Sequence, residues 1–247
     1  MALKIQFNYS PNFNSKKRKP KQIKFLIFHY TGMKKQSEAL NKLTKIQSEV
    51  SSHYFIKNNG DIVLLVPDLY IAWHAGISSW KNHKFLNKFS IGIEINNSGH
   101  QFDYKKFSQK QINSILALSK LLIKKYKIKP KNILGHSDVA PNRKKDPGEK
   151  FPWKILAKNN VSFWHSLSEN FLKKKRRVKV NDKDKKLFFK NLYKIGYSKT
   201  LTKNLNENYH LKSITKAFQR RFRQELVSGI IDKECLMISN NLIKKFN

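Results

Sequence analysis

The chain has 247 residues, 39% of them hydrophobic, which excludes wholesale disorder and allows one domain of ordinary size with a smaller second one. Its single cysteine, Cys235, excludes an internal disulfide. The formal net charge of +35 excludes an acidic protein and raises the question of anionic partners.

The early residues are polar and interrupted, and the first apolar stretch, Ile23 to Phe28, is shorter than the apolar run of a secretory signal. No window of the chain approaches the roughly 20 apolar residues of a membrane span. We therefore expect a cytoplasmic protein with no membrane span, and keep a periplasmic or cell-wall-associated location as the alternative.

Hydrophobic periodicity predicts alternating strands and helices from residue 23 onward. IKFLIFHY is typical of a buried strand, and SSHYFIKNNGDIVLLV has two apolar runs around a turn. The predicted elements are a strand at 23–30, a helix at 36–48, a hairpin turning at 58–61, a strand at 90–97, a helix at 108–126 and a strand at 131–138 that ends in a loop. This order predicts the α/β class, with a mixed β-sheet flanked by helices.

The pattern weakens past Trp153, and the run 171–186 is highly charged. Beyond it, apolar residues recur at helical spacing in three short segments, 185–195, 211–223 and 232–245. We therefore predict three parts: an α/β catalytic domain at 1–168, a charged linker at 169–184 and a small three-helix domain at 185–247.

Three residues form a candidate metal site: His29 and His136, each at the end of a predicted strand, and Asp146 in a loop. A hydrolytic zinc site takes three protein ligands of these types and leaves one position for water. From composition alone, hydrogen bonds within the fold are an equally good explanation of the two histidines. Asp138 is a rival ligand because it lies only two residues from His136.

Five strings add a resemblance to a known family, over about residues 5–165 and in the same order. They are FLIFHYTGM (25–33), SSHYFIKNNGDI (51–62), AWHAGISSW (72–80), SIGIEINNSGH (90–100) and ILGHSDVAPNRKKDPGEKFPW (133–153). They resemble the zinc-dependent N-acetylmuramoyl-L-alanine amidases of the AmpD and AmiD type, which are related to phage T7 lysozyme and the peptidoglycan recognition proteins.

The resemblance implies one zinc ion per chain, with His29, His136 and Asp146 as its ligands. It implies that Glu94 acts as general base or orients the attacking water, and that Lys144 stabilises the oxyanion. Both roles suit the chemistry, since a carboxylate can relay a proton and an ammonium can stabilise developing negative charge.

The resemblance also implies a substrate cleft in which His74, His53 and Trp73 are candidate contacts. For His53 a structural or cleft-wall role is favoured over a substrate contact, and Trp73 and Trp80 could fill the core instead. The implied partners are peptidoglycan fragments, or muropeptides, cleaved between N-acetylmuramic acid and L-alanine. LYKIGY (192–197), AFQRRFR (217–223) and GIIDKECL (229–236) resemble a peptidoglycan-binding helical domain.

Two other functions stay open. A catalytically silent peptidoglycan-binding module would keep the fold without turnover. A charge-driven nucleic-acid-binding protein would explain the net charge. However, only seven of the basic residues are arginine, the residue that commonly reads bases, and no nucleic-acid-binding motif is present. We therefore expect no specific nucleic-acid partner.

Overall fold

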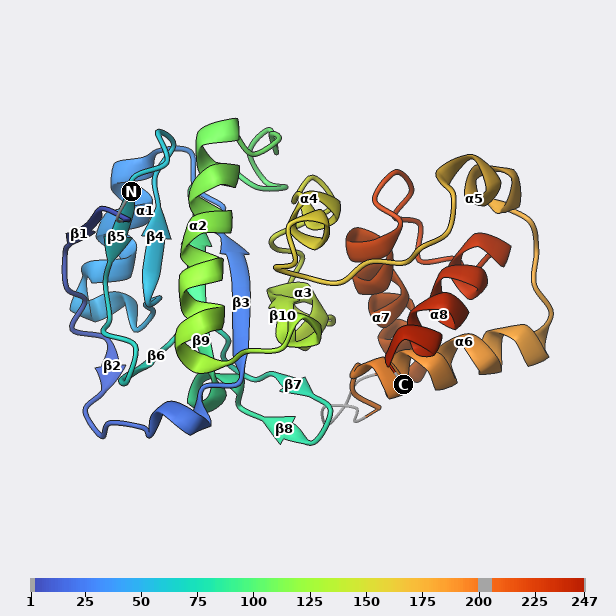
Figure 1. The fold of residues 1–247 in the computed structure, drawn as a ribbon, viewed down its shortest axis with the longest axis horizontal. Coiled ribbons are helices and arrows are strands. Elements are labelled where there is room, and N and C mark those ends of the chain that lie inside the picture. The colour runs from blue at the N-terminus through green and yellow to red at the C-terminus, as the bar shows by residue number, and fades with distance from the viewer. Residues whose placement is uncertain (1–2, 200–205, 247) are drawn as a thin grey trace.

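A computed structural model describes residues 3–199 and 206–246. A sheet-containing part and a helical part lie side by side along the long axis of the molecule (Figure 1). The helices are α1 (Gln36–Thr44), α2 (Gln109–Tyr126), α3 (His136–Val139), α4 (Trp153–Lys158), α5 (Glu169–Lys175), α6 (Asp182–Ile195), α7 (Glu207–Phe222) and α8 (Lys233–Phe246). Short 3-10 turns occur at Pro20–Gln22, Ile46–Ser48, Leu86–Phe89 and Pro130–Asn132.

The main sheet has six strands in the order β1-β5-β4-β9-β3-β10. These are β1 (Ile5–Phe7), β3 (Phe25–Tyr30), β4 (Tyr54–Ile56), β5 (Ile62–Leu64), β9 (Ser90–Ile95) and β10 (Ile133–Gly135). All pairs are parallel except the β4–β5 hairpin. The sheet-containing part also has two small antiparallel strand pairs. They are β2 (Phe13–Asn14) with β6 (Ile71–Ala72), and β7 (Ser79–Trp80) with β8 (His83–Lys84). The predicted mixed α/β fold is confirmed.

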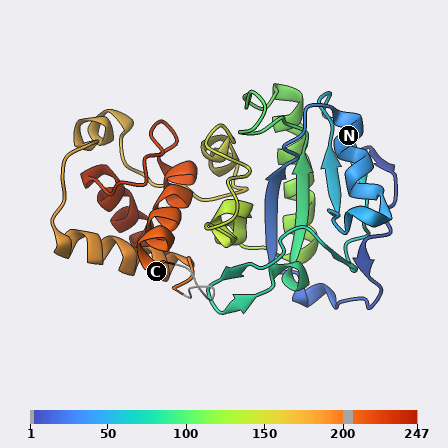
Figure 2. The same ribbon diagram turned by 180° about the vertical axis from the view of Figure 1, so that it is seen from behind.

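Strand alternation separates the two faces of this sheet. From β3, Leu26 and Phe28 pack under α2 with Ile115 and Leu118. On the opposite face, Phe55 and Val63 pack with Ala39 and Leu43 of α1. Figures 1 and 2 show α2 and α1 on these two faces. His29 follows Phe28 and therefore faces away from α2, while Tyr30 packs toward it.

Helix α2 starts and stops where its sequence directs. Ser108 caps it by accepting from the Gln111 backbone amide, and the Gln111 side chain accepts from the Ser108 amide in return. Lys127 ends it in a left-handed conformation with φ 53°. The predicted helix at 36–48 is shorter in the structure, because Lys45 is extended and separates α1 from a 3-10 turn.

Two expectations need correction. The strand predicted at 131–138 ends at Gly135, and His136 opens the short helix α3 instead of entering a loop. The segment expected as a linker at 169–184 contains α5 and the first turn of α6. Leu172 of α5 is only 3% exposed, and this buried side chain fixes the otherwise charged segment against the helical part.

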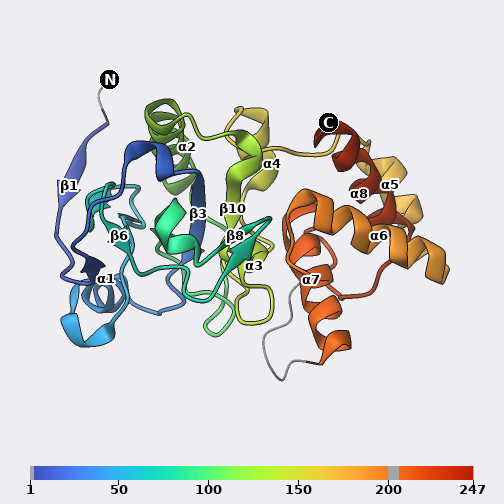
Figure 3. The ribbon, with the colours of Figure 1, turned by 90° about the horizontal axis from the view of Figure 1, so that it is seen from below.

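The helical part shares a hydrophobic core with the sheet. One cluster of buried side chains joins Phe25 and Ile27 of β3 to Phe188, Ile214 and other residues of α6–α8. Trp80 packs edge-on against Tyr197, with ring centroids 4.9 Å apart, so it fills this shared core. Seen from below, α7 lies beside α3 (Figure 3).

A buried ion pair crosses the same boundary. Arg221 of α7 donates to Asp138 of α3 at 2.6 Å and to the Ile133 carbonyl at 2.7 Å, and its guanidinium lies over the Trp153 ring. Asp138 also accepts from the Tyr197 hydroxyl at 2.7 Å. Arg221 and Asp138 are 2% and 1% exposed, so neither charge has water as an alternative partner.

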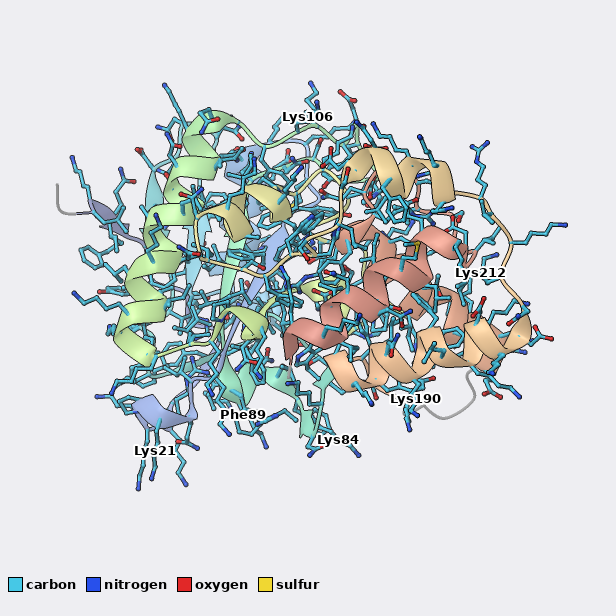
Figure 4. The ribbon with its side chains drawn as sticks, turned by 45° about the vertical axis from the view of Figure 1, so that its right-hand side comes forward. Lys21, Lys84, Phe89, Lys106, Lys190 and Lys212 are labelled. Atoms are coloured by element: carbon cyan, nitrogen blue, oxygen red, sulfur yellow. The ribbon has the colours of Figure 1, made fainter. Side chains whose placement is uncertain are left out.

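Both parts of the molecule carry exposed positive charge. Lysine side chains such as Lys21, Lys84 and Lys190 project from both parts of the molecule (Figure 4). Among residues 3–199 and 206–246, no helix has the length and apolar character needed to cross a membrane.

We expect Arg221→Gln to lower the free energy of unfolding by about 3–5 kcal/mol, because it leaves the Asp138 carboxylate buried without its cation. Urea denaturation followed by circular dichroism measures the change. Arg177→Gln is the matched control, since Arg177 is exposed, and its effect is expected within about 0.5 kcal/mol. Equal stability of the two variants would contradict the role given to the pair.

Candidate metal centre and cleft

Three neighbouring parallel strands bring the candidate residues to one edge of the sheet. In the β3–β9 ladder His29 pairs directly with Glu94, so both side chains leave the same face. In the β3–β10 ladder Phe28 pairs with Gly135, which places His136 level with His29. Asp146 returns to the same point because its carbonyl accepts from the Ser137 amide at 2.8 Å.

His29, His136 and Asp146 form a tight, buried triangle of electron-pair donors. The two Nδ1 atoms are 2.9 Å apart, and they lie 3.1 Å and 3.0 Å from Asp146 Oδ2. Their residues are 1%, 3% and 7% exposed. A tetrahedral metal with bonds of about 2.0–2.1 Å has ligand–ligand edges of about 3.3 Å. The triangle is therefore compatible with a metal site.

The local electrostatics favour the protonation state that metal binding needs. Burial, and then the nearby His136, lower the pKa of His29 to about 4, so its imidazole is neutral near pH 7. Burial opposes ionisation of Asp146, but the charge and hydrogen bond of His136, with those of His29, hold its pKa well below the ordinary value. A neutral imidazole and an ionised carboxylate are both ready ligands.

Hydrogen bonds behind the triangle orient both imidazoles. His136 Nε2 donates to the Ala75 carbonyl at 3.1 Å, which leaves Nδ1 without a proton. His29 Nε2 lies 3.0 Å from His74 Nδ1, and His74 Nε2 lies 3.1 Å from the Ser90 hydroxyl. Donation in the order His29, His74, Ser90 likewise frees Nδ1 of His29. His74 thus supports a member of the triangle and also lines the cleft.

Gly92 of β9 makes room for this support. A Cβ at position 92 would lie 2.4 Å from the His74 ring, closer than any real contact. The glycine inside the strand SIGIEI therefore allows the His74 imidazole to approach the β9 backbone closely while it contacts His29.

A cleft opens above the triangle and contains the other predicted catalytic residues. Its lining includes Glu94 and Lys144, with Trp73 on one wall and α1 on another. Burial, and then the Asp146 charge, raise the pKa of Glu94 to about 8, although Lys144 and Lys42 oppose the shift. One oxygen, Oε2, is fully buried without a hydrogen-bond partner among the described residues.

Of the other predicted residues, Asp138 and His53 are not part of the cleft lining, whereas Trp73 is. Asp138, the rival ligand, points away from the triangle to Arg221 and Tyr197. His53 is 0% exposed, and its Nδ1 accepts from the Gly92 amide at 3.0 Å, so burial leaves it no surface for substrate and its contacts are structural. Trp73 donates to Asn14 at 2.7 Å at the cleft rim.

Sequence reasoning missed part of the cleft wall. Lys42 of α1 lines the cleft beside Met33, and its charge acts on Glu94. Nothing local distinguishes Lys42 from the many other lysines. Met33 is the last residue of the string that contains His29, and that proximity was the only available signal.

Comparison with known proteins places this architecture in context. A family model described as N-acetylmuramoyl-L-alanine amidase matches residues 19–149. The chain is 35% identical to the N-acetylmuramoyl-L-alanine amidase AmiD of Escherichia coli K12 over 237 residues, which cover 91% of this chain and 84% of that protein. It is 40% identical over 104 residues to E. coli 1,6-anhydro-N-acetylmuramyl-L-alanine amidase AmpD, covering 42% of this chain and 55% of that protein.

Comparison with solved structures supports the same family relationship. The structure of E. coli AmiD in complex with the substrate anhydro-N-acetylmuramic acid-L-Ala-D-γ-Glu-L-Lys superposes with a TM-score of 0.80 at 35% identity, covering 91% of this chain and 90% of that one. AmpDh3 of Pseudomonas aeruginosa superposes with a TM-score of 0.78 at 30% identity, covering 99% of both chains. Both similarities extend over the helical part.

We expect the purified chain to bind one divalent transition-metal ion, and His136→Ala to lose it, because two remaining ligands hold a metal far more weakly than three. Elemental analysis after dialysis gives the stoichiometry. His83→Ala, which removes a histidine of β8 outside the triangle, should keep one ion per chain. Retention of the ion by His136→Ala would contradict the site.

Glu94 predicts a pH-dependent stability in metal-free protein. Its folded pKa of about 8 lies above the ordinary 4.5, so the folded chain holds the proton more tightly. The wild type therefore loses stability as pH rises from about 4.5 to 8, and Glu94→Gln does not. We expect equal stability of the two near pH 4 and an advantage of about 1–3 kcal/mol for the variant at pH 9, a value reduced because Glu94 is only partly buried. Denaturant titration of chelated protein at both pH values measures it, and a pH-independent difference would contradict it.

Proposed function

This chain belongs to the N-acetylmuramoyl-L-alanine amidase family, and we propose that it hydrolyses the amide between N-acetylmuramic acid, or its 1,6-anhydro form, and L-alanine in peptidoglycan fragments. The observation that carries the proposal is the buried triangle of His29, His136 and Asp146 beneath a cleft that also contains Glu94 and Lys144. A catalytically silent binding module would not need all three metal ligands together with Glu94 and Lys144.

We propose zinc as the metal, one ion per chain, held by Nδ1 of His29, Nδ1 of His136 and a carboxylate oxygen of Asp146. Two imidazoles and one carboxylate suit zinc, and three protein ligands leave a tetrahedral position free for chemistry. When bound, zinc acts as a Lewis acid that polarises the scissile carbonyl and makes water a nucleophile near neutral pH.

Glu94 handles the proton in this proposal. Glu94 pairs with His29 in the β3–β9 ladder, and its raised pKa of about 8 places it in the range where a group both accepts and returns protons near neutral pH. Bound zinc would pull that pKa down, toward the ionised form that a base requires. Glu94 takes the proton of water and delivers it to the departing amine of L-alanine.

Lys144 provides the positive charge for the transition state. It lines the cleft two residues before Asp146, and its backbone amide donates to the Ala140 carbonyl at 3.0 Å, which anchors the loop. An ammonium fixed next to the carbonyl oxygen stabilises negative charge that develops there during attack.

The substrate is proposed from the relatives. E. coli AmiD was solved with an anhydro-muramoyl tripeptide, and AmpDh3 of P. aeruginosa with an anhydromuramic pentapeptide. We infer that this chain acts on such muropeptides in cell-wall turnover and recycling. A cytoplasmic location remains a prediction that cell fractionation would test.

Zinc-loaded wild type is expected to release the intact peptide, with L-alanine at its amino terminus, from anhydro-muramoyl tripeptide, as detected by mass spectrometry. Glu94→Gln should lower kcat by about 10²–10⁴-fold, because proton transfer is lost, and Lys144→Met should lower it by about 10²-fold or more. Lys84→Met, an exposed lysine of β8, is the matched control and should be unaffected. Substrate binding without turnover at any zinc content would contradict the function and favour the silent module.

A further inference from the structure

Arg220 of α7 differs from the other buried arginines. Four arginines are at most 8% exposed, and three of them have oxygen partners: Arg18 binds backbone carbonyls, Arg221 binds Asp138 and Arg223 binds Asp232. Arg220, 8% exposed, makes no hydrogen bond or ion pair with any described residue. Its Nε is completely buried and has no hydrogen-bond partner. Its two terminal amino groups are not among the completely buried atoms.

Contacts on both sides of Arg220 place it against the loop that contains Asp146. Near the start of α7, His210 Nδ1 lies 2.9 Å from the Asn142 side-chain amide. Past its end, Gln224 donates to the Glu149 carbonyl at 2.6 Å and to the Phe151 carbonyl at 2.7 Å. The helix therefore follows this loop from residue 142 to residue 151, and Arg220 lies between the two contacts.

The acid with the largest electrostatic effect on Arg220 does not form an ion pair with it among the described residues. The charges that act on its guanidinium are led by Glu149, followed by Tyr30 and Asp146. Glu149, however, is paired with His100, whose Nε2 lies 3.2 Å and 3.0 Å from its two oxygens. Asp146 belongs to the metal triangle. The nearby anions thus have other partners, and Arg220 remains a buried cation whose charge is not paired.

Neighbouring side chains add positive charge instead of compensating it. Lys216, one turn before Arg220, interacts with Arg220, Lys212 and Lys145. Lys145 is the loop residue after Lys144, and Lys144 lines the cleft. Basic residues therefore occur both in the loop beside the cleft and on the part of α7 that faces this loop. Concentrated, partly desolvated positive charge of this kind is costly unless an anion completes it.

We propose that Arg220 binds a carboxylate of the substrate's peptide, so that the helical part contributes a residue to substrate recognition. This inference rests on the proposed amidase function. In a muropeptide with the sequence L-Ala-D-γ-Glu-L-Lys, the γ-linkage leaves the α-carboxylate of glutamate free. That group is the first anion beyond the scissile bond, about 7 Å along an extended chain. The planar guanidinium suits a carboxylate because two parallel hydrogen bonds can form.

The test compares two substrates with zinc-loaded full-length protein: anhydro-muramoyl-L-Ala-D-γ-Glu-L-Lys, and the same compound with the glutamate α-carboxylate converted to a carboxamide. We expect Arg220→Gln to lower kcat/KM for the acid by about 10–100-fold, mainly through KM, and for the amide by less than about 3-fold. Arg220→Lys should recover part of the loss for the acid, because it retains a charge. Lys190→Gln, on the exposed face of α6, is the matched control and should change neither substrate.

The outcomes separate this inference from the proposed function. If the wild type cleaves neither substrate, the proposed function fails. If it cleaves both and Arg220→Gln leaves the ratio of acid to amide unchanged, Arg220 is structural and only the inference fails. If Arg220→Gln does not fold, the decision rests on Arg220→Lys, for which an unchanged ratio overturns the inference and a reduced preference for the acid supports it.

Discussion

The parallel pairing of β3 with β9 and β10 is the constraint on which the site depends. Parallel strands deliver their carboxyl ends to one edge, and the register sets His29 beside Glu94 and His136 level with both. A slip of one residue in β3 would turn His29 into the α2 core and expose Phe28 to the cleft. The apolar side chains under α2 therefore fix the metal-centre geometry, because any such slip would expose them and destabilise the fold.

The turn that contains His136 is held from the helical part as well. Asp138 accepts from the Gly135 amide at 2.8 Å within the turn and from Arg221 outside it. Arg221 in turn lies against Trp153 of α4. The helical part thus helps to hold the proposed zinc ligand His136 in position, in addition to any role in binding substrate. A shared core with a buried ion pair at its boundary couples the stabilities of the two parts.

Local sequence patterns predicted the strands and helices whose formation depends on neighbouring residues. The apolar run at 23–30 predicted the buried strand that carries His29, and helical spacing predicted α2 with its ends. The choice between Asp138 and Asp146 as third ligand was beyond such patterns. It depends on Arg221, 83 residues from Asp138, and only the family motif favoured Asp146 in advance. The helix α5 was missed because one buried leucine outweighs a charged segment, and the His74–Ser90 support of His29 was missed because strand and loop meet only in three dimensions.

The net charge has two components with different consequences. The lysines are dispersed and mostly solvated, so their field attracts anionic substrates in a way that salt screens and that carries little specificity. The arginines are few, and four of the seven are buried, where each desolvated guanidinium needs a defined partner. Three have one within the protein. Abundant surface charge therefore accounts for capture of acidic molecules, while discrimination among them is assigned to Arg220, the buried guanidinium without a partner among the described residues.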